Sequence, residues 1–423
     1  MKKKIILVIS LAAVLFLLSG CMMMSGSGLE SMFGSANTAG QAAVTGQAAA
    51  NGDTVTISKS EYEDYERLKK FSELADIYDY AAENFFREPD TDLMVEYAAK
   101  GLMAGLNDPY SFYYNPTEFQ QSMEEDEGRY VGIGVLILTS EQCVISRVFK
   151  NSPAEKAGVL RGDILYRVGE DLYVTPETIN EAVSIMRGVP DTTVDVTFIR
   201  NGEEITFTIL REEVIINQVE STMIADQIGY IAMYQFAGEV ELEFEKALND
   251  LIDDGAKGII IDLRDNPGGW VEQARYIGDL FMDRGEVCYL VYRDGTEDHG
   301  WYKTKDGKAD VQLVILVNGM SASSSEILTG ALRDCADATI VGTQTFGKGI
   351  VQNVLQVGTE GAAFQITVAE YLSPKGNKVH EIGITPDYVV ELPEGDTGAY
   401  DFADIGKDIQ LQKAVEVMEE KLK

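Results

Sequence analysis

The sequence predicts an α+β protein made of several domains, and three observations along the chain lead to this fold class. Apolar residues from Leu68 to Tyr78 recur at the spacing of an α-helix. From about Arg129 the pattern changes to short β-branched runs, which are typical of strands. From Val214 onward, continuous apolar strands alternate with helices, as in an α/β domain. A helical module, a small β-rich domain and a larger α/β domain are therefore expected in this order.

The first 20 residues have the pattern of an export signal. Three lysines, at positions 2–4, precede an apolar run from Ile5 to Leu18. This run is too short and too close to the terminus for a typical membrane span, which needs about 20 apolar residues. We therefore expect residues 1–20 to be a signal peptide.

A candidate lipid-attachment motif ends this segment. Leu18-Ser19-Gly20-Cys21 resembles a bacterial lipobox, in which the cysteine is lipidated and becomes the new N-terminus. A diacylated cysteine carries the two chains that stable anchoring requires. The alternative is an ordinary signal peptide followed by an incidental cysteine. The motif predicts an exported protein that is lipid-anchored at Cys21 on the outer face of the cytoplasmic membrane.

Residues 21–57 are rich in Gly, Ser, Ala, Thr and Gln. Such a segment has too little apolar surface to fold by itself, so it predicts a flexible tether. The formal net charge of the whole chain is −34, which disfavours nucleic acid as a partner and gains nothing from anionic lipid. The same charge is also what an ordinary solvated surface could carry.

The cysteines predict neither a disulfide framework nor a zinc site. With Cys21 assigned to lipid, Cys143, Cys288 and Cys335 remain, an odd number with no CxxC spacing. One pair could still form. No metal or organic cofactor is expected.

The elements expected after the tether divide the chain further. Ser58 and Glu61 have the spacing of a capping box at the start of the first helix. Asn201-Gly202 separates two β-rich runs and predicts a hairpin. The expected parts are a helical module over 58–128, a small β-rich domain over 129–212, an α/β domain over 213–395 and a C-terminal helix within 396–423.

Several familiar catalytic signatures are absent from the sequence. It has no HExxH, no GxSxG, no Walker loop and no GxGxxG after a strand. Its two histidines, His299 and His380, lie in an expected surface loop and near a strand edge. A Ser-His-Asp triad is therefore not expected, although lysine can serve as the base for a serine nucleophile.

A serine-rich turn follows the predicted buried strand Val311–Val317. It contains Ser321, Ser323, Ser324 and Ser325 just before a predicted helix. A nucleophile at a strand-to-helix turn is exposed at the sheet edge, where the first helical N–H groups can stabilise an oxyanion. Serine also favours the N-cap position, so this stretch alone is equally consistent with an ordinary helix cap.

A lysine between two glycines is the second candidate element. Lys348 lies between Gly347 and Gly349 and precedes an apolar strand. A lysine in an apolar niche loses its proton more easily, and the neutral amine can then accept the proton of a serine hydroxyl. Gln352 could accept a hydrogen bond from that amine. A surface lysine in a glycine turn is the alternative.

A glycine pair is the third candidate element. The stretch DLRDNPGG at 262–269 follows another predicted buried strand. Gly268 and Gly269 leave backbone N–H groups free to approach a substrate carbonyl. A sharp turn with no catalytic part would use the same two residues.

The stretches DLRDNPGG, NGMSASSSEI and TFGKGIVQ, in this order, resemble those of the C-terminal processing peptidases, the tail-specific proteases of bacteria and chloroplasts. The runs DPYSFYY at 108–114, VAEYLSPKG at 368–376 and GITPD at 383–387 add to the resemblance, which covers about 58–423. It implies a serine endopeptidase whose α/β catalytic domain has the crotonase/ClpP-like fold.

The resemblance also implies roles for individual residues. Ser323 would be the nucleophile, Lys348 the general base and Gln352 the residue that orients the lysine. The family usually has Gly-[Ser/Thr]-Ala-Ser-Ala-Ser-Glu, whereas here Met320 follows the glycine and Ser324 replaces an alanine. The extra serine leaves the neighbouring hydroxyls as alternative nucleophiles.

Oxyanion donors are implied as well. They would be the backbone N–H groups of Ser324 and of the pair Gly268 and Gly269, without a choice between the two glycines.

Residues 129–212 resemble a PDZ domain of the circularly permuted kind that these peptidases carry. The stretch YVGIG would be its carboxylate-binding loop, with Tyr130, Gly132, Ile133 and Gly134 around the C-terminus of a peptide. Arg187 matches a family position that is implicated in coupling this domain to the active site.

The resemblance implies protein or peptide substrates, cleavage upstream of a C-terminal tail, a homodimer formed through the terminal helices, and a possible regulatory partner. One alternative is a catalytically inactive scaffold that only holds C-terminal tails. Another is an acyl-CoA enzyme, which the crotonase-like fold would allow but a Ser-Lys pair does not favour.

Overall fold

The computed structural model describes residues 57–139, 142–283, 285–300, 309–359, 361–393 and 402–423. The predicted signal peptide, Cys21 and all of the predicted tether up to residue 56 lie outside these residues. The described chain forms two compact units, one ending at Asn115 and one starting at Pro116. None of the helices in the described ranges is long and apolar enough to cross a bilayer.

The first unit is helical, as the sequence predicts. Its helix α2 starts after the predicted capping box, in which Glu61 N donates to Ser58 Oγ at 3.2 Å and Ser58 N donates to Glu61 Oε2 at 2.7 Å. Helices α2, α3 and α4 have no buried residue. The elements of this unit are α2 (Lys59–Leu68), the 3-10 turn η2 (Lys69–Phe71), α3 (Ser72–Asn84), α4 (Thr91–Ala104) and β1 (Phe112–Tyr114).

The second unit begins with α5 (Pro116–Asp126), which the sequence placed in the helical module. A ladder of β2 (Arg129–Gly132) and β9 (Glu212–Ile215) then encloses the small β-rich domain. The first β-branched run after Arg129 is divided into β2 and β3, because Gly134 turns the chain with φ +88°. The predicted hairpin at Asn201-Gly202 is confirmed, and both residues have positive φ.

The sheet of this small domain has the order β3-β4-β5-β7-β8, with β6 paired to β5. Two helices cover it, and a cluster of buried side chains around Ile145, Leu165 and Phe198 forms the core. Its elements are β3 (Val135–Thr139), β4 (Cys143–Val148), α6 (Pro153–Ala157), β5 (Ile164–Val168), β6 (Leu172–Tyr173), α7 (Ile179–Met186), β7 (Thr193–Arg200) and β8 (Glu203–Leu210).

The α/β domain is built on a six-stranded sheet in the order β10-β11-β12-β15-β16-β19. Strands β11, β12, β15, β16 and β19 run parallel, and β10 pairs antiparallel with β11. The strands are β10 (Val219–Ala225), β11 (Ile228–Met233), β12 (Gly258–Asp262), β15 (Gln312–Val317), β16 (Thr339–Gly342) and β19 (Tyr388–Val389). Every residue of β11 and β12 is buried, as expected of a parallel sheet covered on both faces.

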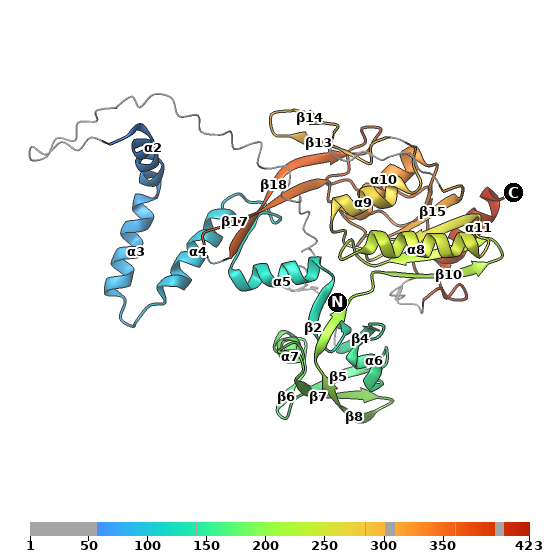
Figure 1. Cartoon of the computed structure of the whole chain (residues 1–423), viewed down its shortest axis with the longest axis horizontal. Helices are drawn as coiled ribbons and strands as arrows, with labels where there is room; N and C mark the ends of the chain where they lie inside the picture. The colour runs from blue at the N-terminus through green and yellow to red at the C-terminus, as the bar shows by residue number, and fades with distance from the viewer. Residues whose placement is uncertain (1–56, 140–141, 284, 301–308, 360, 394–401) are drawn as a thin grey trace, which may run out of the picture. The chain divides into compact units, whose positions relative to one another are not determined.

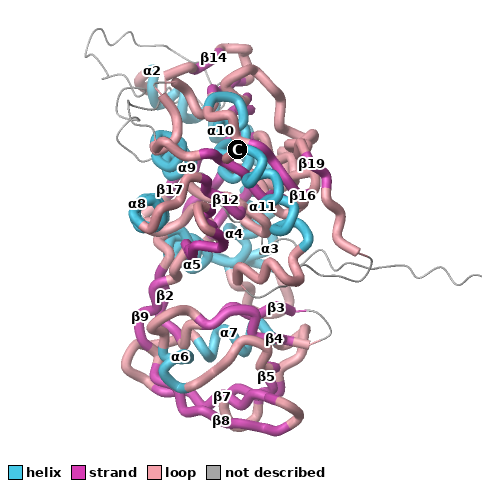
Figure 2. The backbone as a smooth tube through the Cα atoms, turned by 90° about the vertical axis from the view of Figure 1, so that its right-hand side faces the viewer, coloured by secondary structure: helices cyan, strands magenta, loops and turns pink. Residues whose placement is uncertain are grey.

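Helices cover both faces of this sheet (Figures 1 and 2). On one face, Ile259 and Ile261 join the core formed with α8 (Val240–Asp253), α9 (Val271–Asp279) and α10 (Ser324–Cys335). On the other face, Ile260 packs with α11 (Ile409–Lys421). Alternate residues of a strand point to opposite faces, so one apolar strand supplies both cores.

A second, antiparallel sheet extends from the α/β domain. It contains β17 (Ile350–Val357), β18 (Ala362–Leu372), β13 (Tyr289–Tyr292) and β14 (Glu297–Asp298). The sequence predicted only an apolar strand after Lys348. The structure shows that this strand forms a long hairpin with the VAEYLSPKG segment.

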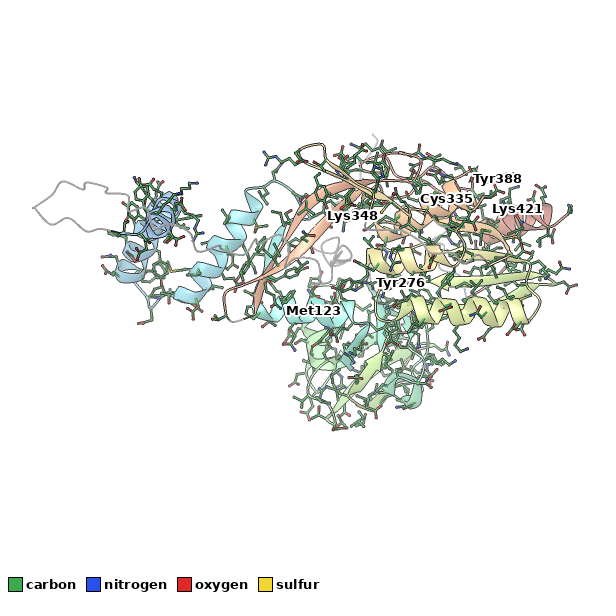
Figure 3. The ribbon with its side chains drawn as sticks, turned by 45° about the horizontal axis from the view of Figure 1, so that its top comes forward. Met123, Tyr276, Cys335, Lys348, Tyr388 and Lys421 are labelled. Carbon is green, nitrogen blue, oxygen red and sulfur yellow. The ribbon has the colours of Figure 1, made fainter. Side chains whose placement is uncertain are left out.

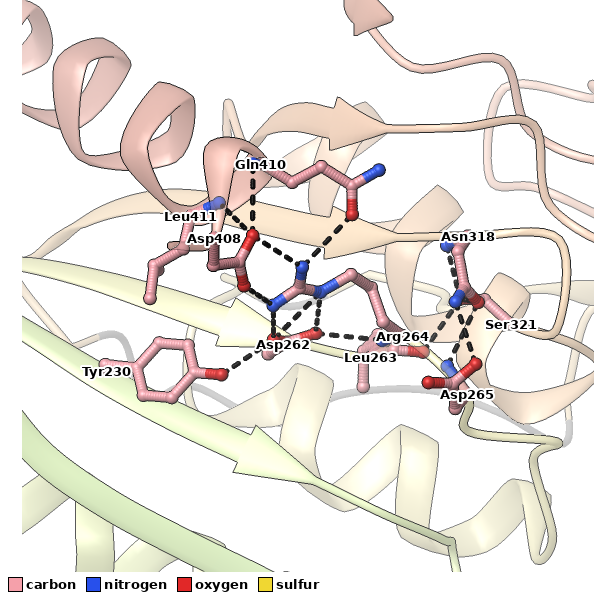
Figure 4. A network of polar contacts seen from close by, with 10 residues as sticks. All are labelled: Tyr230, Asp262, Leu263, Arg264, Asp265, Asn318, Ser321, Asp408, Gln410 and Leu411. Atoms are coloured by element: carbon pink, nitrogen blue, oxygen red, sulfur yellow. Dashed lines mark hydrogen bonds and ion pairs between the residues drawn. The ribbon is translucent and has the colours of Figure 1, made fainter. Parts of the chain in front are cut away.

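A charged network attaches α11 to the loop after β12 (Figure 4). Arg264 Nη2 donates to Asp262 Oδ2 at 2.5 Å and to Asp408 Oδ2 at 2.7 Å. Asp408 is also the N-cap of α11, and Tyr230 donates to Asp262 Oδ2 at 2.7 Å. Burial disfavours the charge of Arg264, but Asp262 and Asp408 outweigh it and raise the pKa of the guanidinium. This network fixes the start of the loop that carries the glycine pair.

The three cysteines in the described ranges are free. Cys143 and Cys288 are buried in separate cores, and Cys335 is exposed at the end of α10. The structure thus places none of them in a disulfide.

Candidate active site

Ser323 lies where the sequence predicts a strand-to-helix turn. It is the N-cap of α10, follows β15 by a short loop, and has φ 55° and ψ −115°. This backbone conformation is rare for a residue with a side chain and is found where surrounding contacts impose it. Ser323 is buried, and its Oγ has no hydrogen-bond partner among the described residues. A strained, buried and unpartnered hydroxyl at a helix N-terminus is available for chemistry.

The neighbouring serines are different in this respect. Each of their hydroxyls donates to a backbone carbonyl and so holds the turn together: Ser321 to Leu263 at 2.7 Å, Ser324 to Gly269 at 2.8 Å and Ser325 to Asn266 at 2.9 Å. All three carbonyls belong to the DLRDNPGG stretch at 262–269, which begins with the last residue of β12. The serine-rich sequence therefore has a structural purpose, which is to join the two loops.

The glycine pair lies directly against this turn. A Cβ atom at Gly268 would lie 2.8 Å from Ser323 Cβ and 2.9 Å from Ser324 N, so only glycine leaves this space open. The Gly268 N–H is already committed, because it donates to Asn266 Oδ1 at 2.9 Å. The Gly268 carbonyl accepts the Phe236 N–H, and the Trp270 N–H donates to the Phe236 carbonyl. The N–H and carbonyl of Gly269, which lies between them, therefore point away from Phe236. On that side the Gly269 carbonyl accepts the Ser324 hydroxyl.

Lys348 is buried with only 1% of its surface exposed, so the interpretation as a surface lysine in a glycine turn is wrong. Figure 3 marks its position just before β17. A Cβ atom at Gly349 would lie 2.2 Å from the His380 backbone N, so the next residue must be glycine for the segment to pack this closely. The flanking glycines bring the lysine into the interior.

Glu326 joins the serine turn to the lysine segment. Its Oε2 accepts the backbone N–H groups of Ser323 at 3.0 Å and Lys348 at 2.9 Å. Its Oε1 accepts the Gly347 N–H at 2.8 Å and the Thr345 hydroxyl at 2.5 Å. Burial raises the pKa of Glu326, although these four hydrogen bonds act in the opposite direction. Glu326 was not predicted as a site residue, although its position three residues after the helix N-cap is a capping-box signal that identifies it.

Gln352 is fully buried on β17. Its Nε2 donates to Thr367 Oγ1 at 3.2 Å across the hairpin, and its Oε1 has no partner among the described residues. The side chain is therefore held by one end and presents a free acceptor at the other.

The two histidines occupy different surroundings. His299 is exposed and bonds to Glu286 and Glu297 at 3.0 and 3.1 Å, which is consistent with the expected surface loop. The backbone of His380 packs on Gly349, next to the lysine, a contact that was not predicted.

The predicted carboxylate-binding loop lies between β2 and β3. Ile133 is in the core of the small domain, and its carbonyl accepts the Ala154 N–H at 2.8 Å. Burial raises the pKa of Tyr130 to about 12, whereas Arg187 and the backbone N–H groups of Gly134 and Val135 lower it.

Arg187, at the C-terminal end of α7, is close to both Tyr130 and α5. Its guanidinium lies 4.9 Å from the centre of the Tyr130 ring and 3.8 Å from Glu125 Oε1. Asp126 follows Glu125 in the chain. Its backbone carbonyl accepts the Gly238 N–H at 2.9 Å and the Trp270 Nε1–H at 3.4 Å. Trp270 directly follows the glycine pair, so a chain of contacts connects Arg187 with that loop.

Comparisons with known proteins agree with the division into three parts. Residues 28–117 match the activating protease CtpB N-terminal domain, 122–210 match the PDZ domain and 227–390 match peptidase family S41. The chain is 34% identical over 345 residues to a carboxy-terminal-processing protease of Bartonella bacilliformis, with 79% of this chain and 78% of the other covered. It is 33% identical over 328 residues to the carboxy-terminal processing protease CtpA of Bacillus subtilis, covering 77% and 70%.

Solved structures show a similar fold. A putative S41 protease from Bacteroides fragilis aligns with a TM-score of 0.56 at 15% identity, covering 80% of this chain and 92% of the other. At this level of identity, the likeness concerns the fold alone.

Proposed function

Because the chain belongs to the carboxy-terminal processing protease family of serine peptidases, we propose that it is an endopeptidase in which Ser323 is the nucleophile and Lys348 the general base. The family resemblance and the fold class that the sequence predicted are confirmed. One observation carries the choice of nucleophile. Among the four serines of the turn, Ser323 has a hydroxyl that is not committed to a backbone carbonyl.

In the proposed reaction, Ser323 Oγ attacks the carbonyl carbon of the scissile peptide while Lys348 Nζ takes the hydroxyl proton. The C–N bond then breaks, and the leaving amine receives that proton from the lysine, which leaves an acyl-enzyme ester. Water attacks the ester carbonyl carbon and gives a proton to Lys348 Nζ. The bond from that carbon to Ser323 Oγ then breaks, Oγ takes the proton back from the lysine, and the new carboxyl end is released. Burial of Lys348 supports this role, since desolvation disfavours the ammonium form.

Gln352 would orient the lysine. Its free Oε1 can accept a hydrogen bond from an amine, and the Thr367 hydroxyl holds the other end of the amide. An amine held in one direction presents its lone pair to the serine more often, which supports the catalytic role that the family resemblance implies.

The oxyanion would be stabilised by the backbone N–H groups of Ser324 and Gly269. Ser324 is the first residue of α10, where N–H groups point out of the helix. Between the two glycines, Gly269 is the better donor, because the Gly268 N–H donates to Asn266. Gly268 has a different part, which is to leave space for the substrate carbonyl beside Ser323.

We further propose that the PDZ domain recognises the C-terminal tails of protein substrates. The backbone N–H groups of Gly134 and Val135 lower the pKa of Tyr130, which supports a place for a negative charge beside them, and a peptide carboxylate would supply that charge. A peptide ending in a free carboxylate should bind, and the same peptide ending in an amide should bind at least about ten-fold more weakly. Equal binding of the two peptides would contradict this proposal.

Arg187 is our candidate for coupling the PDZ domain to the peptidase. A tail that displaces Tyr130 would disturb the contacts of Arg187 with Tyr130 and Glu125, and the next residue in α5 binds Trp270 beside the glycine pair. A partner protein could act on the same contacts. Replacement of Arg187 by alanine should change the activation of cleavage by tail peptides more than it changes cleavage of a short substrate.

The location and the assembly remain proposals as well. The lipobox-like motif supports anchoring through Cys21 on the outer face of the cytoplasmic membrane, and a Cys21→Ser variant should leave the membrane fraction. Exposed apolar side chains on the N-terminal helices support a homodimer, among them Leu74, Ile77 and Tyr80. An Ile77→Glu variant should shift the protein from dimer to monomer in light scattering.

The central test compares cleavage of an unfolded protein such as casein by the wild type, Ser323→Ala and Lys348→Ala. Both variants should be inactive, and a fluorophosphonate should label the wild type but not Ser323→Ala. Ser324→Ala serves as the control for the neighbouring hydroxyl and should keep its label. Cleavage by all three proteins at the same rate would overturn the mechanism, and no cleavage by the wild type would favour the inactive scaffold.

A further inference from the structure

We propose that Tyr371 is a positioning residue, which sets the place of Ser323 relative to Lys348 through hydrogen bonds to both segments. This inference rests on the proposed roles of these two residues. Tyr371 belongs to the VAEYLSPKG segment, for which the mechanism above has no use. It is one of the largest side chains that are fully buried in the described chain.

Tyr371 contacts the two segments with opposite ends. Its backbone N–H donates to the carbonyl of Gly349, the residue after the lysine, at 3.0 Å. Its hydroxyl donates to the carbonyl of Ser323 at 3.2 Å. The rigid aromatic ring of Tyr371 lies between its backbone N–H and its hydroxyl. The distance from the lysine segment to the serine therefore varies little.

The hydroxyl also acts on the peptide unit that contains the oxyanion donor. The Ser323 carbonyl and the Ser324 N–H belong to one planar trans peptide and point in opposite directions. Three donors hold that carbonyl: the N–H groups of Glu326 and Ile327 at 2.8 and 2.9 Å, and the Tyr371 hydroxyl. Holding the carbonyl therefore fixes the direction of the Ser324 N–H.

This direction matters because Ser323 has a positive φ, in which its backbone is strained. The helical N–H groups hold the carbonyl from within α10, whereas Tyr371 holds it from the neighbouring sheet. Burial and the nearby Glu326 carboxylate raise the pKa of Tyr371 well above its ordinary value. The hydroxyl accordingly stays protonated and remains a donor over the whole pH range of the enzyme.

The alternative is that the hydroxyl only satisfies its own hydrogen bond inside the core, as buried tyrosines usually do. The two interpretations differ in what the removal of the hydroxyl changes. A purely structural role affects thermal stability, whereas a positioning role affects the rate of acylation of Ser323.

The test is a Tyr371→Phe variant, which removes the hydroxyl and keeps the ring. We expect kcat on a peptide substrate to fall about ten-fold, as for the loss of one hydrogen bond in the transition state, with KM changed less than about two-fold. Fluorophosphonate labelling of Ser323 should slow by a similar factor. The melting temperature should fall by no more than about 4 °C.

Two controls make the result specific. Tyr292→Phe removes a hydroxyl from the adjacent strand β13 and should keep wild-type kcat. Incorporation of 3-fluorotyrosine at position 371 restores a hydroxyl and should restore the rate, whether or not the phenylalanine variant folds well. Unchanged kcat and labelling in Tyr371→Phe, with Ser323→Ala inactive, would overturn the positioning role alone. Activity retained in Ser323→Ala would instead overturn the proposed function.

Discussion

Ser323 and Lys348 donate their backbone N–H groups to the same oxygen atom, Oε2 of Glu326, at 3.0 and 2.9 Å. The two proposed catalytic residues belong to separate loops, and their backbones meet at one buried carboxylate. The second oxygen of Glu326 binds Gly347 and Thr345 of the lysine loop. A single side chain thus holds the nucleophile turn against the segment that carries the base.

Replacement of Glu326 by glutamine should lower both activity and stability. The amide NH₂ cannot accept hydrogen bonds, so the N–H groups on one side lose their partner in a buried place. Hydrogen bonds to charged groups contribute about 1.5–3 kcal/mol each, so we expect the free energy of unfolding to fall by at least about 2 kcal/mol and kcat by at least ten-fold. Denaturant unfolding and peptide cleavage measure the two effects. Glu245→Gln, on the exposed side of α8, is the control and should be neutral. Wild-type kcat in Glu326→Gln would refute this role.

Replacement of Gly268 by alanine should abolish most of the activity. The new Cβ atom would lie 2.7 Å from the Ala322 carbonyl and 2.8 Å from Ser323 Cβ, so the two loops would have to move apart. A displacement of about 1 Å in an active site can cost about 100-fold in rate. Gly255 has a similar positive φ but open space around its Cβ position, so Gly255→Ala should lose stability through strain and keep its kcat. Equal kcat for the two variants would show that crowding at Gly268 is not important.

Replacement of Arg264 by glutamine should strongly destabilise the protein. It would leave Asp262 and Asp408 buried without their cation, and breaking a buried ion pair in this way costs about 3–5 kcal/mol. Arg129 makes a comparable contact with Glu127 on the surface, so Arg129→Gln should cost less than about 1 kcal/mol. Urea unfolding midpoints of the two variants measure the difference. Similar midpoints would mean that the network of Figure 4 contributes little.

Asp126 should make the stability of the protein fall as the pH rises. Burial, together with nearby Glu125, raises the pKa of Asp126 to about 8, and neither of its carboxylate oxygens has a partner among the described residues. The unfolded chain loses this proton near pH 4, so the folded state holds one proton more between about pH 4 and pH 8. The stabilising effect of this proton is therefore lost progressively over that range.

An Asp126→Asn variant removes this titration. Its melting temperature should exceed that of the wild type by a margin that grows from pH 5 to pH 8. Asp171→Asn, at an exposed position, should show no such trend. A margin for Asp126→Asn that is constant over this pH range would contradict the raised pKa.

The sequence was sufficient for the order of the domains and for most of the elements of the α/β sheet. Strands β11, β12 and β15 are continuous apolar runs because helices cover both of their faces, and such runs are visible without a structure. The antiparallel hairpin of β17 and β18 was largely missed. Its residues are only partly buried, so their pattern is weaker.

By itself, the sequence also determined which candidate catalytic groups this protein has: a serine turn, a lysine between glycines and a glycine pair. Each can be recognised without a structure because its residues are neighbours along the chain. Only the tertiary structure decided what each group is free to do. It committed three of the four serine hydroxyls to backbone carbonyls, buried Lys348, and committed the Gly268 N–H to the Asn266 side chain. It also brought Glu326 and Tyr371 into contact with both segments. Hydrogen bonding and burial depend on residues that are distant along the chain, and local sequence does not contain this information.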